Sequence, residues 1–375
     1  MMGKARNFLL LFILLIPASL FSQTQNARPY WYLLERGKNY FRSGSYGEAL
    51  IAFEDARDER RTMFTRLEDT MIQLLSMPEV RLCGDALDLV ERYIADHGRT
   101  DAARALDELY TRVNRSKLAN SAKAALAEFG RLGAYPEAEF WIGETYCAEG
   151  ELLIGLKQYQ IAYEMRSLLD TPGFEIEILY KIADIHRIRQ EYQEMIRVLE
   201  EILKSDSLWS QSENSFLRSA QSKTLENDGI NRFLTLYRYS NAQTEKAHRL
   251  LGFYYYATGR HYEAVPHLQF AFLIQNSIFI EELIRRRYDY QFVSLDELIS
   301  EINRQQQLVP YLEQFDYYKT IYYLGNSFLG SGKSIPARRF WNMLALHPEA
   351  GEWYARSRSQ LNARNPITDP PLENP

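Results

Sequence analysis

The amino-acid sequence predicts an all-α protein built from repeated pairs of antiparallel helices. Within 245–275, the apolar residues Leu251, Tyr255, Leu268 and Phe272 recur at helical rather than strand spacing. A glycine separates the two helical stretches, and the same arrangement recurs elsewhere in the chain. One helix pair cannot bury its apolar face alone, so the recurrence predicts a stack of pairs that share a continuous core.

The repeated unit is recognised by the spacing of small and aromatic residues. Gly252 is followed by Tyr255, then by Gly259, Ala264 and Ala271, at fixed offsets of three, seven, twelve and nineteen residues. Further copies, with some substitutions, surround Gly37, Gly143, Ala183 and Gly325. The clear units therefore lie near 30–63, 136–169, 176–209, 245–278 and 318–351.

Local chemistry in the first unit supports a helix, a tight turn and a second helix. Gly44 stands where the first helix must end with a residue of positive φ, a conformation that glycine adopts at least cost. The sequence Ser45 to Glu48 has the form of a capping box, which starts the next helix at once. Gly37 lies inside the first helix, where glycine costs about 1 kcal/mol relative to alanine. We therefore expect the partner helix to approach closely at Gly37.

This G-x-x-Y…G…A pattern, with a period of about 34 residues, resembles the tetratricopeptide repeats. The resemblance implies an α-α superhelix of right-handed sense over most of 23–364, with degenerate units within 64–135, 210–240 and 279–316. The proline that the family places near the end of each unit is mostly absent. Pro266 falls early in a second helix, where it is expected to cause a kink.

The sequence from Ser294 to the C-terminus predicts two further helices and a tail. Ser294 and Glu297 form a second capping box, which opens a helix predicted over Leu295–Gln306. The segment 351–363 is predicted to be a polar capping helix, since a terminal repeat has no neighbour on its outer side. The segment 365–375 carries four prolines and is predicted to be a disordered tail.

The N-terminal segment 1–22 has the form of a secretory signal peptide. Lys4 and Arg6 precede an apolar run over Phe8–Ile16, and small residues follow up to Ser22. The run is shorter than the roughly 20 residues of a spanning helix, although a retained anchor stays open. Cysteine is absent near the exit, which disfavours a lipid-modified terminus. We expect an exported protein, periplasmic or extracellular.

Charge and cysteine content narrow the range of partners. Without Lys4 and Arg6 the net charge is −7, which disfavours nucleic acid and anionic membranes as partners. The two cysteines, Cys83 and Cys147, lie about two units apart, too far for the Cα separation of about 7 Å that a disulfide allows. Both are predicted to be unpaired.

Signals of enzymatic chemistry are weak. The segment Ser327–Ser334 differs at one residue from a phosphate-binding loop, but a predicted helix precedes it and Gly332 is the turn glycine of a repeat. The six histidines are scattered, and His186 is predicted to be packed inside. Arg285–Arg287 is predicted to be a solvated face, with an anion-binding patch as the alternative. We expect no catalytic residues, no metal and no cofactor.

In the resembled family, ligands lie in a concave groove lined by the first helix of each unit. Transferring those positions to this sequence predicts a partner-binding groove that mixes aromatic and charged side chains, the composition of interface hot spots. Its predicted residues are Trp31, Lys38, Phe41, Arg42, Phe140, Glu144, Tyr180, Asp184, Arg187, Arg249, Phe253, Tyr256, Tyr322 and Asn326.

The predicted function is that of a non-enzymatic exported scaffold, which binds a protein or peptide segment in this groove within a cell-envelope complex. The alternative is an accessory protein of a solute-uptake system that holds a small ligand. The sequence leaves the identity of the partner and the oligomeric state open, because repeats specify shape more strongly than partner.

Overall fold

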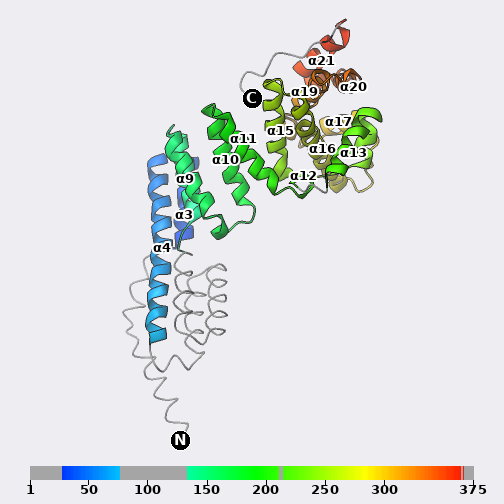
Figure 1. The fold of residues 1–375 in the computed structure, drawn as a ribbon. Helices are drawn as coiled ribbons and strands as arrows, with labels where there is room; N and C mark the ends of the chain where they lie inside the picture. The colour runs from blue at the N-terminus through cyan, green and yellow to red at the C-terminus, as the bar shows by residue number, and fades with distance from the viewer. Residues whose placement is uncertain (1–27, 77–132, 211–213, 365, 367–375) are drawn as a thin grey trace. The chain divides into compact units, whose positions relative to one another are not determined.

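The computed structural model describes residues 28–76, 133–210, 214–364 and 366 (Figure 1). These residues form sixteen α-helices and two short 3-10 helices, and no strand occurs among them. The all-α class and the packing of helices in neighbouring pairs are therefore confirmed. The predicted signal peptide, Cys83, the units expected within 77–132 and the tail from 367 onward lie outside the described residues.

The chain divides into two compact units, Met1–Ile185 and His186–Pro375, and the division falls inside helix α10. In the N-terminal unit, α3 packs on α4, α8 packs on α9, and α4 also contacts α8. The helices of this unit are α3 (Tyr30–Arg42), α4 (Tyr46–Ser76), α8 (Pro136–Ala148), α9 (Leu152–Glu164), η2 (Arg166–Leu168) and α10 (Phe174–Ile188).

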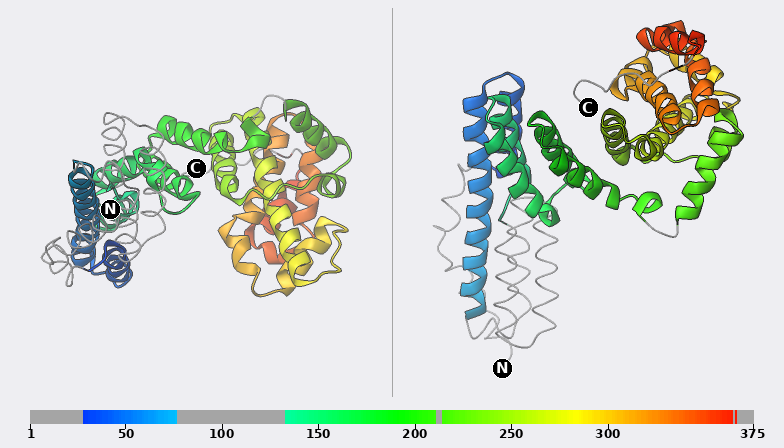
Figure 2. Two further views of the ribbon diagram at one scale, coloured as in Figure 1. Left: turned by 90° about the horizontal axis from the view of Figure 1, so that it is seen from below. Right: turned by 45° about the horizontal axis from the view of Figure 1, so that its top comes forward.

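In the C-terminal unit, α15 pairs with α16, α19 pairs with α20, and α16 packs on α19. Figure 2 shows α21, drawn in red, at the edge of this unit beside α20. The helices are α11 (Tyr192–Lys204), α12 (Ser207–Ser210), α13 (Ser215–Asn227), α14 (Ile230–Leu236), α15 (Ala242–Ala257), α16 (His261–Arg286), α17 (Leu295–Arg304), α18 (Val309–Gln314), α19 (Tyr317–Gly330), α20 (Ser334–Leu344), η4 (Pro348–Ala350) and α21 (Glu352–Asn362).

Glycines inside the first helix of four pairs allow the second helix to approach closely. A Cβ added at Gly37 would lie 2.5 Å from the ring of Phe53, and one at Gly252 would lie 2.6 Å from the side chain of Leu268. Gly143 and Gly325 show the same crowding. The structure therefore accounts for these glycines by packing, as the sequence predicts for Gly37.

The turns between paired helices depend on left-handed backbone conformations. Gly44, Gly150, Gly259 and Gly332 all have positive φ, between 74° and 90°. The unit around Ala183 has Gln190 at this position, with a φ of 60°. A non-glycine residue there costs about 1 to 2 kcal/mol, so Gln190 is a strained point of the chain.

Several helix boundaries differ from the predicted units. Helix α4 continues to Ser76, beyond the unit boundary expected at 63, and α16 continues to Arg286, beyond 278. Helix α16 also passes through Pro266 rather than ending there. At the start of α17 the Ser294 hydroxyl accepts from the amide of Glu297, as a capping box requires. Helix α21 lies within the segment 351–363.

Candidate functional site

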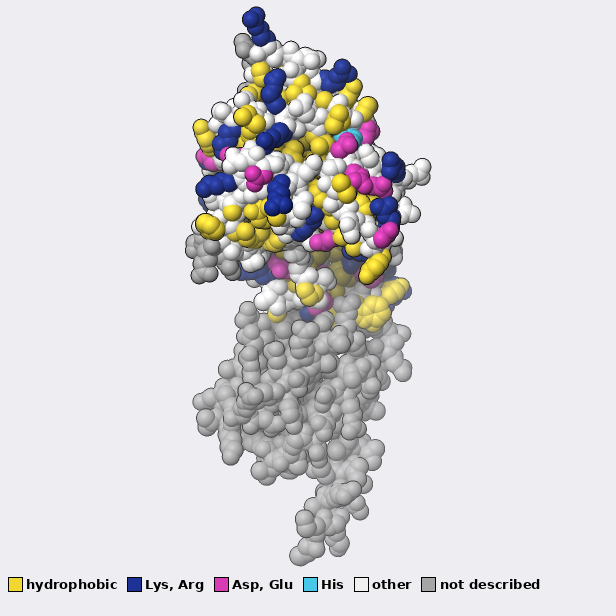
Figure 3. Space-filling model, turned by 90° about the vertical axis from the view of Figure 1, so that its right-hand side faces the viewer, with side chains coloured by type: hydrophobic (Ala, Val, Ile, Leu, Met, Phe, Trp, Pro, Cys, Tyr) yellow, Lys and Arg dark blue, Asp and Glu magenta, His cyan; other side chains and the backbone are white. Residues whose placement is uncertain are grey.

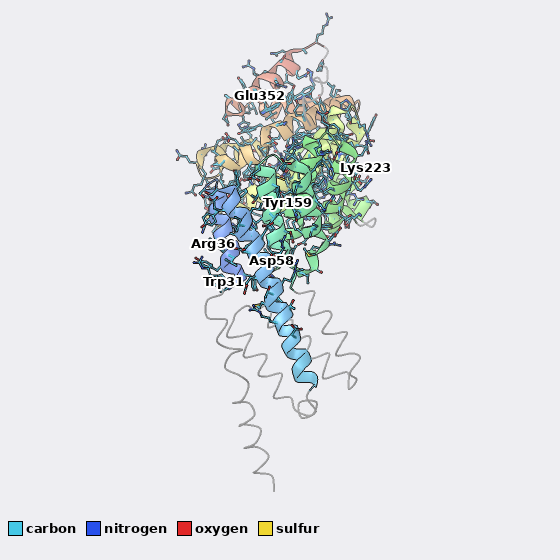
Figure 4. The ribbon with its side chains drawn as sticks, turned by 90° about the vertical axis from the view of Figure 1, so that its left-hand side faces the viewer. Trp31, Arg36, Asp58, Tyr159, Lys223 and Glu352 are labelled. Atoms are coloured by element: carbon cyan, nitrogen blue, oxygen red, sulfur yellow. The ribbon has the colours of Figure 1, made fainter. Side chains whose placement is uncertain are left out.

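In the N-terminal unit, the predicted groove residues of α3 remain at least partly accessible. Trp31, near the start of the helix (Figure 4), is 38% exposed, and Arg42 at its end is exposed. Lys38 and Phe41 are half-buried. The first helix of this unit therefore presents two aromatic and two basic side chains at its surface.

A half-buried tryptophan on α8 joins this surface. The ring centroids of Phe41 and Trp141 lie 5.6 Å apart, and the Lys38 ammonium lies 5.6 Å from the centre of the Trp141 ring. Lys38 also donates to Glu35 at 2.7 Å, which holds the ammonium in place. We call Lys38, Phe41 and Trp141 the Trp141 patch.

Trp141 was missed because the family offset selects the neighbouring residue. Phe140 is only 1% exposed, and its ring packs against Tyr159 and Phe174. Phe140 therefore belongs to the core of the unit and presents no surface. A signal was available in the sequence, since two adjacent aromatic residues on one helix point in different directions.

Glu144, one turn beyond the Trp141 patch on α8, is held by two other helices. Its carboxylate accepts from Lys181 of α10 at 2.8 Å and from the hydroxyl of Tyr159 of α9. Burial and this carboxylate raise the pKa of Tyr159, so the phenol stays protonated and donates. Tyr180 and Asp184 are half-buried on α10. The charge of Glu144 is thus already paired with an ammonium.

The predicted groove residues of the C-terminal unit are mostly buried. Phe253, Tyr256 and Tyr322 are each no more than 3% exposed. Tyr323 lies 4.8 Å from Tyr256 and 5.9 Å from Phe253, measured between ring centroids. These rings form an aromatic cluster within the unit, so they contribute to its core rather than to an accessible groove.

Arg249 is also buried, and its guanidinium is neutralised inside the unit. It donates to Glu245 at 2.9 Å and bonds Asp316, which precedes α19. Gln275 of α16 donates to the same Glu245 carboxylate at 2.6 Å. Burial raises the pKa of Glu245, and the nearby guanidinium opposes that shift. This network joins α15 and α16 to the start of α19.

Arg187, another predicted groove residue, is half-buried on α10.

Asn326 is fully buried, and neither its amide nitrogen nor its amide oxygen has a hydrogen-bond partner. The residue lies on α19 one turn beyond Tyr322. A buried amide without partners costs free energy relative to one in water. Asn326 is therefore a predicted groove residue whose buried amide makes no hydrogen bond through its side chain.

Two histidines that are far apart in sequence meet inside the C-terminal unit. The Nδ1 atoms of His248 and His267 lie 3.2 Å apart, and the ring of Trp209 contacts both. Burial lowers the pKa of His267 to about 3 and holds the pKa of His248 well below its usual value. Both rings are therefore neutral near pH 7, and the pair was not foreseen from the sequence.

The remaining chemical motifs have structural explanations. The segment Ser327–Ser334 forms the end of α19, a turn and the start of α20, and Lys333 pairs with Glu226 at 2.6 Å. His186 is buried, as predicted, and bonds Glu191 at 2.8 Å. The described part of the chain contains no group of three side chains that could hold a metal ion.

The arginine run at the end of α16 is neutralised by neighbouring carboxylates. Arg285 and Arg286 pair with Glu282, and Arg287 approaches both Asp289 and Glu301. Figure 3 shows basic and acidic side chains interspersed with hydrophobic ones on the visible face of this unit. This arrangement supports the solvated face rather than the anion-binding patch.

The sequence is similar to those of two uncharacterized proteins. It is 23% identical over 338 residues to an uncharacterized protein of Treponema pallidum (strain Nichols), covering 88% of this chain and 89% of that protein. It is 24% identical over 262 residues to an uncharacterized protein of Borreliella burgdorferi (strain ATCC 35210 / DSM 4680 / CIP 102532 / B31), covering 62% of this chain and 78% of that protein. No family model matches the chain.

Among the residues that the structure describes, none of the helices is both long enough and apolar enough to cross a membrane.

Proposed function

We propose that this protein is a non-enzymatic scaffold of tetratricopeptide-like repeats, which binds a protein or peptide segment through the Trp141 patch. The observation that supports this proposal is the placement of a half-buried tryptophan between a lysine and a phenylalanine from another helix. The patch lies where two first helices, α3 and α8, come together.

The chemistry of the patch suits a protein partner. A half-buried tryptophan offers a large apolar ring that a partner can cover, and removing such an anchor typically costs about 2 kcal/mol or more of binding free energy. The basic side chains of Lys38 and Arg42 favour orientation of the partner more than raw affinity.

The aromatic cluster of the C-terminal unit has a different role in this proposal. Its rings are covered by Trp353 and by Lys319, whose ammonium lies 4.7 Å from the centre of the Phe253 ring. We assign these residues to the stability of the unit. Partner binding is assigned to the N-terminal unit, where the corresponding residues of α3 are exposed or half-buried.

The proposal includes export to the cell envelope. Its support is the sequence of 1–22, with its basic start, apolar run and small-residue exit. The partner is then another envelope or exported protein. Mass spectrometry of the mature N-terminus tests this part, with a first residue close to position 23 as the expected result and an intact Met1 as the contradicting one.

Site-specific photo-crosslinking in the native cells tests the binding surface. A benzophenone amino acid replaces Trp31 or Arg42 on α3, and as a matched control it replaces Asp58, an exposed residue on the second helix of the same pair (Figure 4). We expect one shared adduct from both α3 positions and none from position 58. Equal adducts from all three positions would overturn the assignment of the surface.

A further inference from the structure

Two buried imidazoles meet inside an aromatic cluster of the C-terminal unit. His248 of α15 and His267 of α16 place their Nδ1 atoms 3.2 Å apart, which is within hydrogen-bond distance. The ring of Phe270 lies 5.1 Å from that of His248, and the ring of Tyr255 lies 5.5 Å from that of His267, measured between centroids. The two imidazoles therefore face each other and aromatic rings.

Trp209, on the four-residue helix α12, covers this pair. Its ring centroid lies 4.6 Å from that of His248 and 4.7 Å from that of His267. Trp209 is half-buried, whereas both histidines are buried. A helix of four residues has little stability of its own, so α12 stays over the imidazoles through its contacts with other elements.

Two charged side chains supply contacts of this kind. The buried carboxylate of Asp206 accepts from the amides of Leu208 and Trp209, at 2.9 and 3.1 Å. The same carboxylate accepts from the Thr244 hydroxyl of α15 at 2.9 Å. Arg218 of α13 donates to the carbonyls of Leu208 and Trp209, each at 2.9 Å. These bonds fasten α12 to its neighbours.

The charged groups on the elements around the pair are bonded to other residues. Besides Asp206 and Arg218, they are Glu201 with Lys204 on α11, Glu245 with Arg249 on α15, and Glu263 with Arg260 at the start of α16. Two phenols also lie here, Tyr239 on Asp206 and Tyr255 on His267, and burial raises the pKa of both, so both stay protonated. A proton added to the pair would therefore place a buried cation beside a second imidazole, which costs free energy.

Water reverses this preference. Burial lowers the pKa of His267 to about 3 and holds the pKa of His248 well below its usual value, whereas a solvated imidazole has a pKa of about 6.5. If Trp209 moved away and water reached the pair, the open state would bind protons below about pH 6.5 that the closed state does not. Acid therefore favours the open state.

The helices beneath Trp209 are joined by contacts that do not involve α12. Gly252 of α15 packs closely on Leu268 of α16. Glu245 of α15 accepts from Gln275 of α16 at 2.6 Å and from Arg249 at 2.9 Å. Movement of α12 would therefore leave α15 and α16 packed on each other.

We propose that the His248–His267 pair is an acid-sensitive latch, in which protonation of the pair releases α12 with Trp209 while α15 and α16 stay together. The latch gives the C-terminal unit a second conformation whose population is set by pH. The released state exposes the two imidazoles and the ring of Phe270 to solvent. This inference is independent of the proposed function, because it concerns a different unit and requires no partner.

Native-state hydrogen exchange of the full chain at pH 7.5 and pH 5.5 tests the latch. The amides of Trp209 and Ser210, which donate to the Asp206 carbonyl, report the opening of α12, and the amides of α16 report unfolding of the unit. After correction for intrinsic exchange rates, the opening constant of α12 should rise by about 100-fold on acidification, about tenfold for each histidine. It should exceed that of α16 at both pH values.

Two outcomes of this experiment would overturn the proposal. Equal opening constants for α12 and α16 would mean that α12 opens only when the whole unit unfolds. An opening constant of α12 that does not change with pH would mean that its opening does not bring the histidines into water.

Replacing either histidine should remove its share of the pH dependence. His248→Phe keeps an aromatic ring in the cluster and should reduce the rise from about 100-fold to about tenfold, and His267→Phe should do the same. The matched control is His261→Gln, at a half-buried position at the start of α16, which should retain the full rise. A full rise in both phenylalanine variants would show that other groups sense the pH and would contradict the proposal.

A further variant separates the groups that hold the latch from those that sense pH. Asp206→Asn removes the charged acceptor of α12 and should raise the opening constant by about tenfold at both pH values, because charge-assisted hydrogen bonds are the stronger ones. The rise between the two pH values should stay at about 100-fold. Asp228→Asn, at an exposed position after α13, is the control and should change neither quantity. Loss of the pH dependence in Asp206→Asn would identify Asp206 as the titrating group and overturn the assignment to the histidines.

Discussion

At the scale of single residues, the glycines inside first helices determine how closely the paired helices approach. A Cβ at Gly252 would lie 2.6 Å from the side chain of Leu268 and 3.2 Å from its backbone nitrogen. The sequence places glycine at the same offset in four of the five clear units, despite its cost in a helix. Close packing of paired helices could therefore be predicted without a structure.

Replacing this glycine should destabilise the C-terminal unit. We expect Gly252→Ala to lower the free energy of unfolding by about 1 to 3 kcal/mol, because the crowding outweighs the gain in helix propensity. Gly47→Ala is the control, since a Cβ there meets no atom within 4 Å. Urea denaturation measures both variants. A Gly252→Ala protein as stable as the parent would show that the helices can separate at little cost.

The buried histidine pair predicts a dependence of stability on pH. The pKa values of His248 and His267 are lowered in the folded state, so below about pH 6.5 the unfolded chain binds protons that the folded chain does not. The contribution of the pair to stability should fall as the pH drops below about 6.5, with a limiting slope of about 1.4 kcal/mol per pH unit for each histidine that stays neutral in the folded state.

The variant His248→Phe isolates this effect. It removes one of the two buried imidazoles beside Phe270, and the difference in unfolding free energy between parent and variant should change steadily from pH 7 to pH 5. Chemical denaturation at several pH values provides the measurement. A difference that stays constant with pH would mean that His248 takes up its proton over the same pH range in the folded and the unfolded chain.

The contact between His248 and His267 could not be predicted from the sequence. His248 and His267 are nineteen residues apart, and nothing in the spacing shows that α15 and α16 bring their Nδ1 atoms to 3.2 Å. The same holds for Arg249, whose partner Asp316 lies 67 residues later. Contacts of this kind depend on the packing of helices, which a residue pattern describes only approximately.

At the scale of helices, the Arg249 network joins α15, α16 and the start of α19. Arg249→Leu would leave the Glu245 carboxylate buried without its cation, and loss of one partner from a buried pair costs about 3 to 5 kcal/mol. Denaturant unfolding of the C-terminal unit measures the loss.

A surface ion pair supplies the control for this prediction. Arg260 pairs with Glu263 at 3.0 Å, with both side chains nearly half exposed. Arg260→Leu should change stability by less than about 1 kcal/mol. If Arg249→Leu costs no more than Arg260→Leu, the network is not a determinant of how these helices are held together.

The predicted groove shows which surface residues a helical spacing pattern can identify and which it misses. The offsets fall on the first helices of observed pairs, and α3 presents Trp31, Lys38, Phe41 and Arg42 with partial or full exposure. On α8 the offset selects Phe140, which is buried, while the accessible ring is Trp141. A change of one residue rotates a side chain by about 100° around a helix, so a single wrong offset exchanges core for surface.

At the scale of the whole molecule, the repeats predicted the all-α class and the turn residues in most units. They did not predict the length of α4 and α16, which continue beyond their repeat boundaries. Those extensions follow from long apolar and charged runs with helical propensity, and no residue in the repeat pattern ends them. The repeat pattern does not identify the partner, since one fold can support many different functions.

The central proposal is that a protein partner binds the Trp141 patch, and an affinity measurement tests it most directly. The partner segment captured by crosslinking from α3 would be titrated against the parent chain, Lys38→Glu and Lys157→Glu. Lys157 is exposed on α9, the second helix of its pair, so its variant has the same change of charge away from the patch.

The proposal predicts that Lys38→Glu weakens binding by about tenfold or more, that Lys157→Glu changes it by less than about twofold, and that both variants unfold like the parent. Equal affinities for all three chains would contradict the assignment of partner binding to the Trp141 patch.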